Sequence, residues 1–227
     1  MISDDKLREV GEFRSKHRIP IVSWIKYDNN YRAALLRSSQ PMAGLKQRRN
    51  EADEFYLNHI FKLNISNCLD KLLIVDARPL VNAIANRGAG GGYENDDNYE
   101  KLEIQFANIQ NIHVMRESLR KVFEMGLPSS HNASVHQHNS VNTPNTQNNN
   151  NNNNSSLNDD KNYLVNLENS KWLEHIRLVL NGVLKIVRYI SQNRASVLVH
   201  CSDGWDRTAQ VVFVFDFLHQ TYKSHLP

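Results

Sequence analysis

Two short runs rich in branched apolar residues, 71–76 and 196–200, limit the possible folds of this chain more than any other feature. Both have the length of a strand and lack polar alternation, which is typical of strands buried on both faces of a sheet. Residues 172–190 carry apolar side chains at steps of three and four, and 208–222 are strongly apolar, so both segments are expected to be helices. Strands that alternate with helices predict an α/β domain with a largely parallel central sheet flanked by helices.

Three further segments have readable patterns. Residues 102–109 alternate apolar and polar side chains, which predicts a half-exposed strand. Residues 114–125 are expected to form a helix that Gly126 ends. The segment 80–86 leads into a glycine-rich stretch, 88–92, where the backbone is expected to approach another group closely.

Residues 129–160 form a polar tract in which twelve residues are asparagine. Such a segment buries too little apolar surface to offset its ordering entropy, so we expect a disordered insertion. The chain is then one domain, 1–227, that the tract interrupts. The tract is either an expansion without function or a segment that binds a partner or aggregates.

Composition narrows the function classes. The chain of 227 residues is long enough for a hydrophobic core, and apolar stretches such as 211–215 are far shorter than a membrane span. The first residues do not have the pattern of a secretory signal, so a cytoplasmic protein, peripheral to membranes, is expected. The two cysteines, Cys68 and Cys201, have no metal-ligand spacing around them and are interpreted as thiols. A formal net charge of +3 permits an anionic partner and does not imply nucleic acid.

The chemistry is expected in the loop His200–Thr208, with the sequence HCSDGWDRT, which joins the second apolar run to the last helix. Unpaired N–H groups and the positive end of a helix dipole favour an anion at such a junction. Arg207 can add a bidentate grip on phosphate oxygens. The same surroundings lower the pKa of a thiol, which predicts that Cys201 is a thiolate at neutral pH.

A thiolate in an anion-binding loop is a nucleophile for phosphorus. Attack by Cys201 gives a phosphocysteine intermediate whose charge the loop amides and Arg207 stabilise. Thr208 is expected to donate a hydrogen bond to the sulfur. This chemistry needs no metal and no cofactor. The alternative for Cys201 is a buried structural cysteine.

Two carboxylates within an anion-binding loop need an explanation, because each repels a phosphate dianion. Asp206 either donates a proton to the leaving oxygen or caps the helix that follows it. Asp203 is expected to recognise substrate hydroxyls or to support the loop. Trp205 is expected to form an apolar wall beside a sugar-like ring, with simple surface packing as the alternative. The amides of Ser202 and Gly204 complete the predicted substrate-binding loop.

This loop resembles the active-site loop of the myotubularin family of phosphoinositide 3-phosphatases. The likeness extends over residues 12–128 and 162–222, and several long motifs in the family's order are far more specific than a lone cysteine and arginine. The matching segments are FRSKHRIP at 13–20, SQP at 39–41, DARP at 76–79, GGGYE at 90–94, NIHVMRES at 111–118 and WLEHI at 172–176.

The resemblance implies hydrolysis of the D3 phosphate of phosphatidylinositol 3-phosphate and of phosphatidylinositol 3,5-bisphosphate, lipids at a membrane surface. The site residues that it implies are the nucleophile Cys201, the phosphate clamp Arg207, the general acid Asp206, the substrate contacts Asn86 and Asn111, and Asp76, which is needed for activity.

The chain also departs from the family pattern. It lacks the amino-terminal membrane-binding domain and stops soon after Arg207, so it is expected to be a truncated catalytic segment whose sheet is incomplete at the C-terminus. Helix 208–222 is then expected to expose an apolar face that promotes association, for example with other family members. Two rival functions stay open: a catalytically incompetent adaptor, and a phosphotyrosine phosphatase, which the acidic loop disfavours.

Overall fold

The computed structural model describes residues 2–27, 32–62, 72–99, 102–126 and 162–223. They form two compact units, one of Met1–Ile112 with His175–Pro227 and one of His113–Glu174. The predicted insertion at 129–160 and Cys68 lie outside the described residues.

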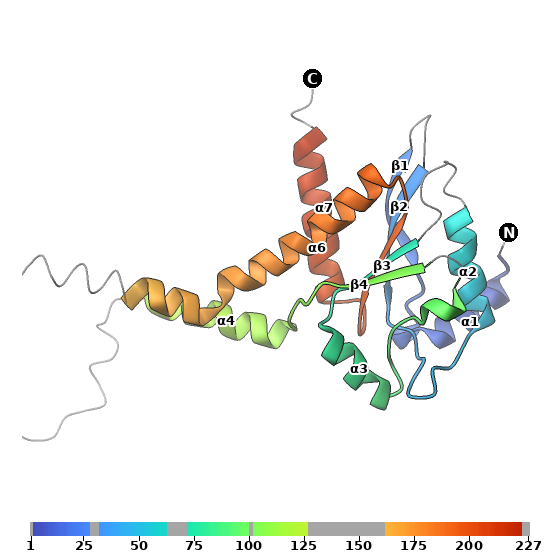
Figure 1. The fold of residues 1–227 in the computed structure, drawn as a ribbon, viewed down its shortest axis with the longest axis horizontal. Helices are drawn as coiled ribbons and strands as arrows, with labels where there is room; N and C mark the ends of the chain where they lie inside the picture. The colour runs from blue at the N-terminus through green and yellow to red at the C-terminus, as the bar shows by residue number, and fades with distance from the viewer. Residues whose placement is uncertain (1, 28–31, 63–71, 100–101, 127–161, 224–227) are drawn as a thin grey trace, which may run out of the picture. The chain divides into compact units, whose positions relative to one another are not determined.

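The first unit is built on a five-stranded sheet with the order β1-β2-β5-β3-β4. The strands β2, β5, β3 and β4 run parallel, and only β1 at the edge is antiparallel to its neighbour β2. This arrangement confirms the expected α/β fold with a largely parallel sheet (Figure 1). The strands are β1 (Ile21–Tyr27), β2 (Arg32–Ser39), β3 (Leu72–Asp76), β4 (Leu102–Phe106) and β5 (Val197–Cys201).

Helices cover both faces of this sheet. Figure 1 shows α1 and α2 on one side of it and α6 and α7 on the other. Because successive strand residues point to opposite faces, Ile74 and Leu198 pack with Leu57 of α2 in one apolar cluster. On the other side Gly182 of α6 lies close to Val211 of α7. The helices of this unit are α1 (Asp4–Phe13), α2 (Glu51–Lys62), α3 (Leu80–Gly88), α6 (Trp172–Gln192, within the unit from His175) and α7 (Arg207–Lys223), with short 3-10 turns η1 (Ser15–His17) and η2 (Asp96–Asn98).

The second unit consists of helical segments on either side of the undescribed tract. Its main element is α4 (Ile112–Gly126, within this unit from His113), and residues 162–170 are helical as well. The Ser118 hydroxyl donates a 2.6 Å hydrogen bond to the carbonyl of Ser170, so the two helical segments are tied together. In the described part of the chain, no helix is long and apolar enough to cross a membrane.

Most predicted elements are present, with shifted ends. The strand expected at 102–109 stops at Phe106, because Asn108 adopts a φ of 58°, which is incompatible with extended backbone. The helix expected at 208–222 begins one residue earlier, at Arg207, and Phe213 on it is 72% exposed.

Candidate active site

The predicted loop lies at the carboxyl edge of the parallel sheet. It follows β5, which lies between β2 and β3. Cys201 is the last residue of β5 and pairs in register with Ser39 of β2, while His200 pairs with Asp76 of β3. The chain then turns through residues 202–206 into α7. Ligands of α/β sheets bind at this edge, where loops from neighbouring strands meet.

Cys201 is buried, with 1% of its surface exposed. Burial works to raise the pKa of this thiol, but hydrogen bonds from the hydroxyl and amide of Thr208, the charge of Arg207 and the amide of Gly204 outweigh it, and the pKa of Cys201 is lowered. Thr208 is fully buried, and its hydroxyl forms no hydrogen bond with a nitrogen or oxygen atom. This hydroxyl is therefore available to donate to the Cys201 sulfur. These groups therefore stabilise the thiolate relative to that of an ordinary cysteine.

Arg207 brings a buried positive charge to the same place. Only 7% of the residue is exposed, and its Nη2 donates a 3.3 Å hydrogen bond to the Ser202 hydroxyl. Its Nε and Nη1 atoms are buried without a hydrogen-bond partner. A buried guanidinium with two unpartnered nitrogens is costly unless an anion binds it, so this geometry fits a phosphate clamp.

The helix that follows the loop adds amides that lie outside its own hydrogen-bond ladder. The first hydrogen bond of its ladder runs from the Gln210 amide to the carbonyl of Asp206, at 3.0 Å. The N–H groups of Arg207, Thr208 and Ala209 precede that ladder, as in the first turn of any helix. They add to the positive potential that favours an anion at this end of α7.

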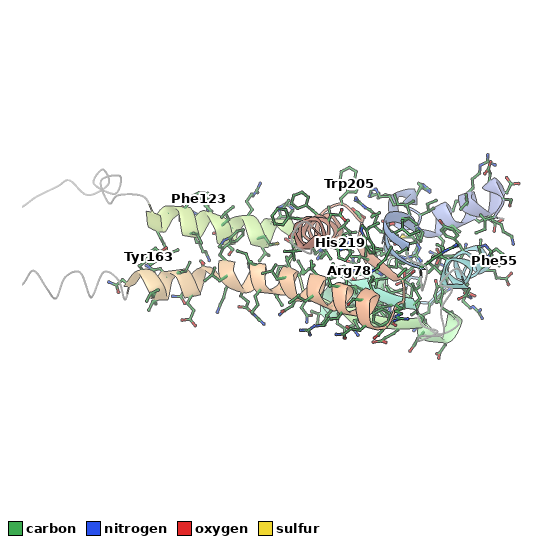
Figure 2. The ribbon with its side chains drawn as sticks, turned by 90° about the horizontal axis from the view of Figure 1, so that it is seen from above. Phe55, Arg78, Phe123, Tyr163, Trp205 and His219 are labelled. Atoms are coloured by element: carbon green, nitrogen blue, oxygen red, sulfur yellow. The ribbon has the colours of Figure 1, made fainter. Side chains whose placement is uncertain are left out.

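Asp203 and Trp205 both contact the segment 15–18, which follows α1. The Asp203 carboxylate accepts a 3.0 Å hydrogen bond from the Ser15 hydroxyl, so it supports the loop, one of its two expected roles. Trp205 is 69% exposed and extends outward from the ribbon (Figure 2). The Arg18 guanidinium lies 4.2 Å from the centroid of its ring. This exposed ring is available to a ligand on its other side.

Asp206 holds a second loop in place. Its Oδ2 accepts a 2.9 Å hydrogen bond from the amide of Ile112, and its Oδ1 accepts one of 2.7 Å from the Gln210 side chain. The carboxylate thus binds the first residue of α4, whereas the sequence predicted a cap on α7 as one alternative. Asn111 directly precedes Ile112, so this bond brings Asn111 next to the end of the loop 201–206.

Asp76 and Asn86 belong to a polar cluster beside the loop rather than to the loop itself. Asp76 is fully buried, and its carboxylate accepts hydrogen bonds from Arg78 Nε at 2.9 Å and Nη2 at 2.6 Å. Gln40 Oε1 accepts from three groups, which are Arg78 Nη1, Asn86 Nδ2 and the Gly92 amide. The backbone N–H of Gln40 donates to the carbonyl of Ser202, so Gln40 joins this cluster to the loop 201–206.

A buried chain of charges behind the loop was not anticipated from the sequence. His200 Nε2 lies 2.9 Å from Glu94 Oε2, and Arg14 Nη1 donates to Glu94 Oε1 at 2.6 Å. Arg14 also forms a two-pronged pair with Asp53, at 2.8 and 2.6 Å. Arg14 and Glu94 each lie in a segment that resembles the family pattern, 13–20 and 90–94. They are 80 positions apart in the sequence, and no local pattern indicates that they pair.

Comparison with known proteins agrees with this geometry. The family model of the myotubularin-like phosphatase domain matches residues 1–223. Myotubularin of Rattus norvegicus is 44% identical over 209 residues, which cover 92% of this chain and 29% of that protein. Myotubularin of Xenopus laevis is 40% identical over 220 residues, or 97% of this chain and 31% of that protein.

A phosphatidylinositol-3,5-bisphosphate 3-phosphatase of Mus musculus is 42% identical over 210 residues, which cover 92% of this chain and 28% of that protein. The chain thus spans between 28% and 31% of the length of these relatives. The family match extends over almost the whole chain and includes the loop that holds Cys201 and Arg207. The chain therefore belongs to the myotubularin-like phosphatase family.

Proposed function

We propose that this chain is the catalytic segment of a phosphoinositide 3-phosphatase that removes the D3 phosphate through a phosphocysteine intermediate. The observation that carries the proposal is the pairing of a thiol with a lowered pKa, Cys201, with a buried guanidinium, Arg207, two of whose nitrogens have no partner. These groups supply a nucleophile and an anion clamp within one short loop.

The first step forms a bond between the Cys201 sulfur and phosphorus while the bond from phosphorus to the D3 oxygen breaks. Asp206 gives its proton to that oxygen, which leaves as a hydroxyl of the inositol ring. Arg207 and the loop amides stabilise the charge on the transferring group. The amide of Ile112 and the side chain of Gln210 hold the Asp206 carboxyl at the loop during this transfer.

The second step hydrolyses the intermediate. Water attacks phosphorus, its proton passes to the Asp206 carboxylate, and the bond between phosphorus and sulfur breaks. Inorganic phosphate leaves, and both the Cys201 thiolate and the protonated Asp206 are restored. The same carboxyl acts as acid and then as base, as microscopic reversibility requires.

The substrate is proposed to be phosphatidylinositol 3-phosphate and also the 3,5-bisphosphate, on which the murine relative acts by its name. Trp205 supports this class of substrate because an exposed aromatic face beside the loop suits a sugar-like ring. Asn111 and Asn86 are proposed to contact the substrate. Two hydrogen bonds support this, since the amide of Ile112, next to Asn111, binds Asp206, and Asn86 donates to Gln40. Asp76 is proposed to act through Arg78, since its carboxylate is fully buried. The protein would work at the cytoplasmic surface of a membrane.

The test measures phosphate release by this chain from short-chain phosphatidylinositol 3-phosphate, from the 3,5-bisphosphate and from a phosphotyrosine peptide. The lipids are expected to react and the peptide to react far more slowly, and Cys201→Ser is expected to abolish turnover. Turnover that survives this substitution would refute the mechanism. No turnover by well-folded protein would favour an adaptor role, and a preference for the peptide would indicate a protein phosphatase.

A further inference from the structure

Successive carbonyl groups of the catalytic loop are all held by donors from one neighbouring part of the chain. The donors lie in or beside β2 and in the segment that follows η1. The bonds run from the Gln40 amide to Ser202 O at 3.1 Å, from Arg18 Nη1 to Asp203 O at 2.5 Å, and from Arg37 Nη2 to Gly204 O at 3.1 Å.

Fixing a carbonyl also fixes the amide at the other end of the same peptide group. The peptide unit is planar and trans, so its C=O and N–H point in opposite directions. Arg18 holds the carbonyl of Asp203, which directs the N–H of Gly204 to the opposite side. The Gly204 amide is also one of the groups that lower the pKa of the Cys201 thiol. The carbonyl that Arg18 holds and the amide that acts on the thiol therefore belong to one rigid group.

The same reasoning applies one residue further on. Arg37 holds the carbonyl of Gly204, which directs the N–H of Trp205 to the side opposite Arg37. Gly204 has a φ of 73°, and a Cβ there would lie 2.5 Å from the carbonyl oxygen of Ser38. The loop backbone is thus pressed against β2, at the strand that carries Arg37.

Arg18 makes a second contact with the loop. Its guanidinium lies over the Trp205 ring at 4.2 Å from the centroid, and the neighbouring Ser15 hydroxyl donates to the Asp203 carboxylate at 3.0 Å. Both arginines donate to neutral carbonyl oxygens of the loop. Their geometry therefore serves the orientation of the loop backbone.

We infer that Arg18 and Arg37 are positioning residues for the phosphate site: each turns one peptide group so that its N–H faces the Cys201 sulfur or the phosphoryl group bound there. The inference rests on the proposed function for the identity of the anion. It assigns the two arginines separate targets. Arg18 acts on the Gly204 amide and so on the sulfur, whereas Arg37 acts on the Trp205 amide and so on the bound oxyanion.

The experiment compares the full chain with Arg18→Met, Arg37→Met, Arg18→Lys and Arg37→Lys. Arg188→Met is the control, because Arg188 is an exposed arginine on α6 and its loss removes the same charge. The first readout is the pH dependence of alkylation at Cys201 by iodoacetamide, followed by peptide mass spectrometry, which gives the pKa of this thiol. The second is the dissociation constant of tungstate, an oxyanion similar in shape to phosphate, by calorimetry.

Arg18→Met is expected to raise the pKa of Cys201 and to weaken tungstate binding by about tenfold, as when a hydrogen bond to a charged group is lost. Arg37→Met is expected to weaken tungstate binding about as much while shifting the pKa of Cys201 less. The lysine variants keep the charge and one donor, so they are expected to recover part of the loss. Arg188→Met is expected to leave both readouts unchanged.

Unchanged tungstate affinity and thiol pKa in folded Arg18→Met and Arg37→Met would overturn the inference, as would a parent chain that does not bind tungstate. If the methionine variants do not fold, the same two measurements are made on the lysine variants. A Cys201 pKa and a tungstate dissociation constant equal to those of the parent would then overturn the inference. A parent chain that binds tungstate through a low-pKa Cys201 but does not hydrolyse the lipids would refute the proposed function alone.

Discussion

The buried charges next to the loop 201–206 allow one prediction to be worked through in numbers. Glu94 is 2% exposed and accepts hydrogen bonds from Arg14 at 2.6 Å and from His200 at 2.9 Å. Glu94→Gln removes the charge and turns one acceptor oxygen into a donor, so one partner is left unpaired. Removing one member of a buried ion pair typically costs ~3–5 kcal/mol. We expect the free energy of unfolding to fall by about that amount, a large part of the ~5–15 kcal/mol of a typical domain.

The same pair gives this prediction a pH signature. Burial opposes the charged form of His200, but Glu94 and Asp76 outweigh it and raise the pKa of His200 above its usual range. Such a group stabilises the fold below its unfolded pKa of ~6.5, and the contribution disappears as pH rises through its folded pKa. Burial likewise opposes charge on Glu94, but His200 and Arg14 lower the pKa of Glu94, so its contribution disappears as pH falls below about 4.3. Stability from the pair is expected to be greatest between these limits.

Urea unfolding followed by circular dichroism, at about pH 5.5 and about pH 8, measures both effects. The set comprises the parent, Glu94→Gln, His200→Asn and the double variant. Glu117→Gln is the matched control, since Glu117 pairs with Arg120 at a side-chain exposure of 50%, and the loss of an exposed ion pair is expected to change stability little. A loss below ~1 kcal/mol for Glu94→Gln, or the same pH dependence as the parent, would refute the assigned charges.

Three further predictions concern the loop. Thr208→Val is expected to raise the pKa of Cys201, because hydrogen bonding from Thr208 opposes burial there, so alkylation near neutral pH slows; an unchanged pH profile would exclude this role. Asp206→Asn is expected to slow hydrolysis of poor leaving groups far more than of an activated aryl phosphate, whereas equal slowing would make Asp206 structural. Gly204→Ala is expected to destabilise the fold by about 1–3 kcal/mol or more in urea unfolding, because φ is 73° and Ser38 O leaves no room for a Cβ; parent-like stability would contradict this strain.

The strands β3 and β5 were predictable because burial on both faces leaves a plain apolar run, whereas the interior strand β2 was not predicted although most of its residues are buried. The strand β1 was not, because it lies at the sheet edge and Ile21, Val22 and Ile25 on it are all more than half exposed. Without a buried face it shows none of the alternation on which a prediction depends. The position of an edge strand depends on its pairing with a neighbouring strand, here β2. The local sequence of β1 does not indicate that pairing.

The site divides in the same way. Cys201 and Arg207 were predictable, since only five residues separate them within one loop and their chemistry needs no other segment. The contacts of Arg18 and Arg37 with that loop were not, because they join residues 185 and 167 positions apart. Such contacts depend on the register between β2 and β5. Asp206 illustrates the limit, since its position at the start of α7 suggested a cap while its carboxylate binds Ile112.

Gln40 has a consequence for the motions of this protein. Its side-chain oxygen accepts hydrogen bonds from Arg78, Asn86 and the Gly92 backbone. Its backbone N–H donates a hydrogen bond to the carbonyl of Ser202 in the loop. Neither the glycine-rich stretch nor the loop 201–206 can open without disturbing a shared residue. Their exchange of amide hydrogen for deuterium is therefore expected to occur in step, as one cooperative opening rather than two independent ones.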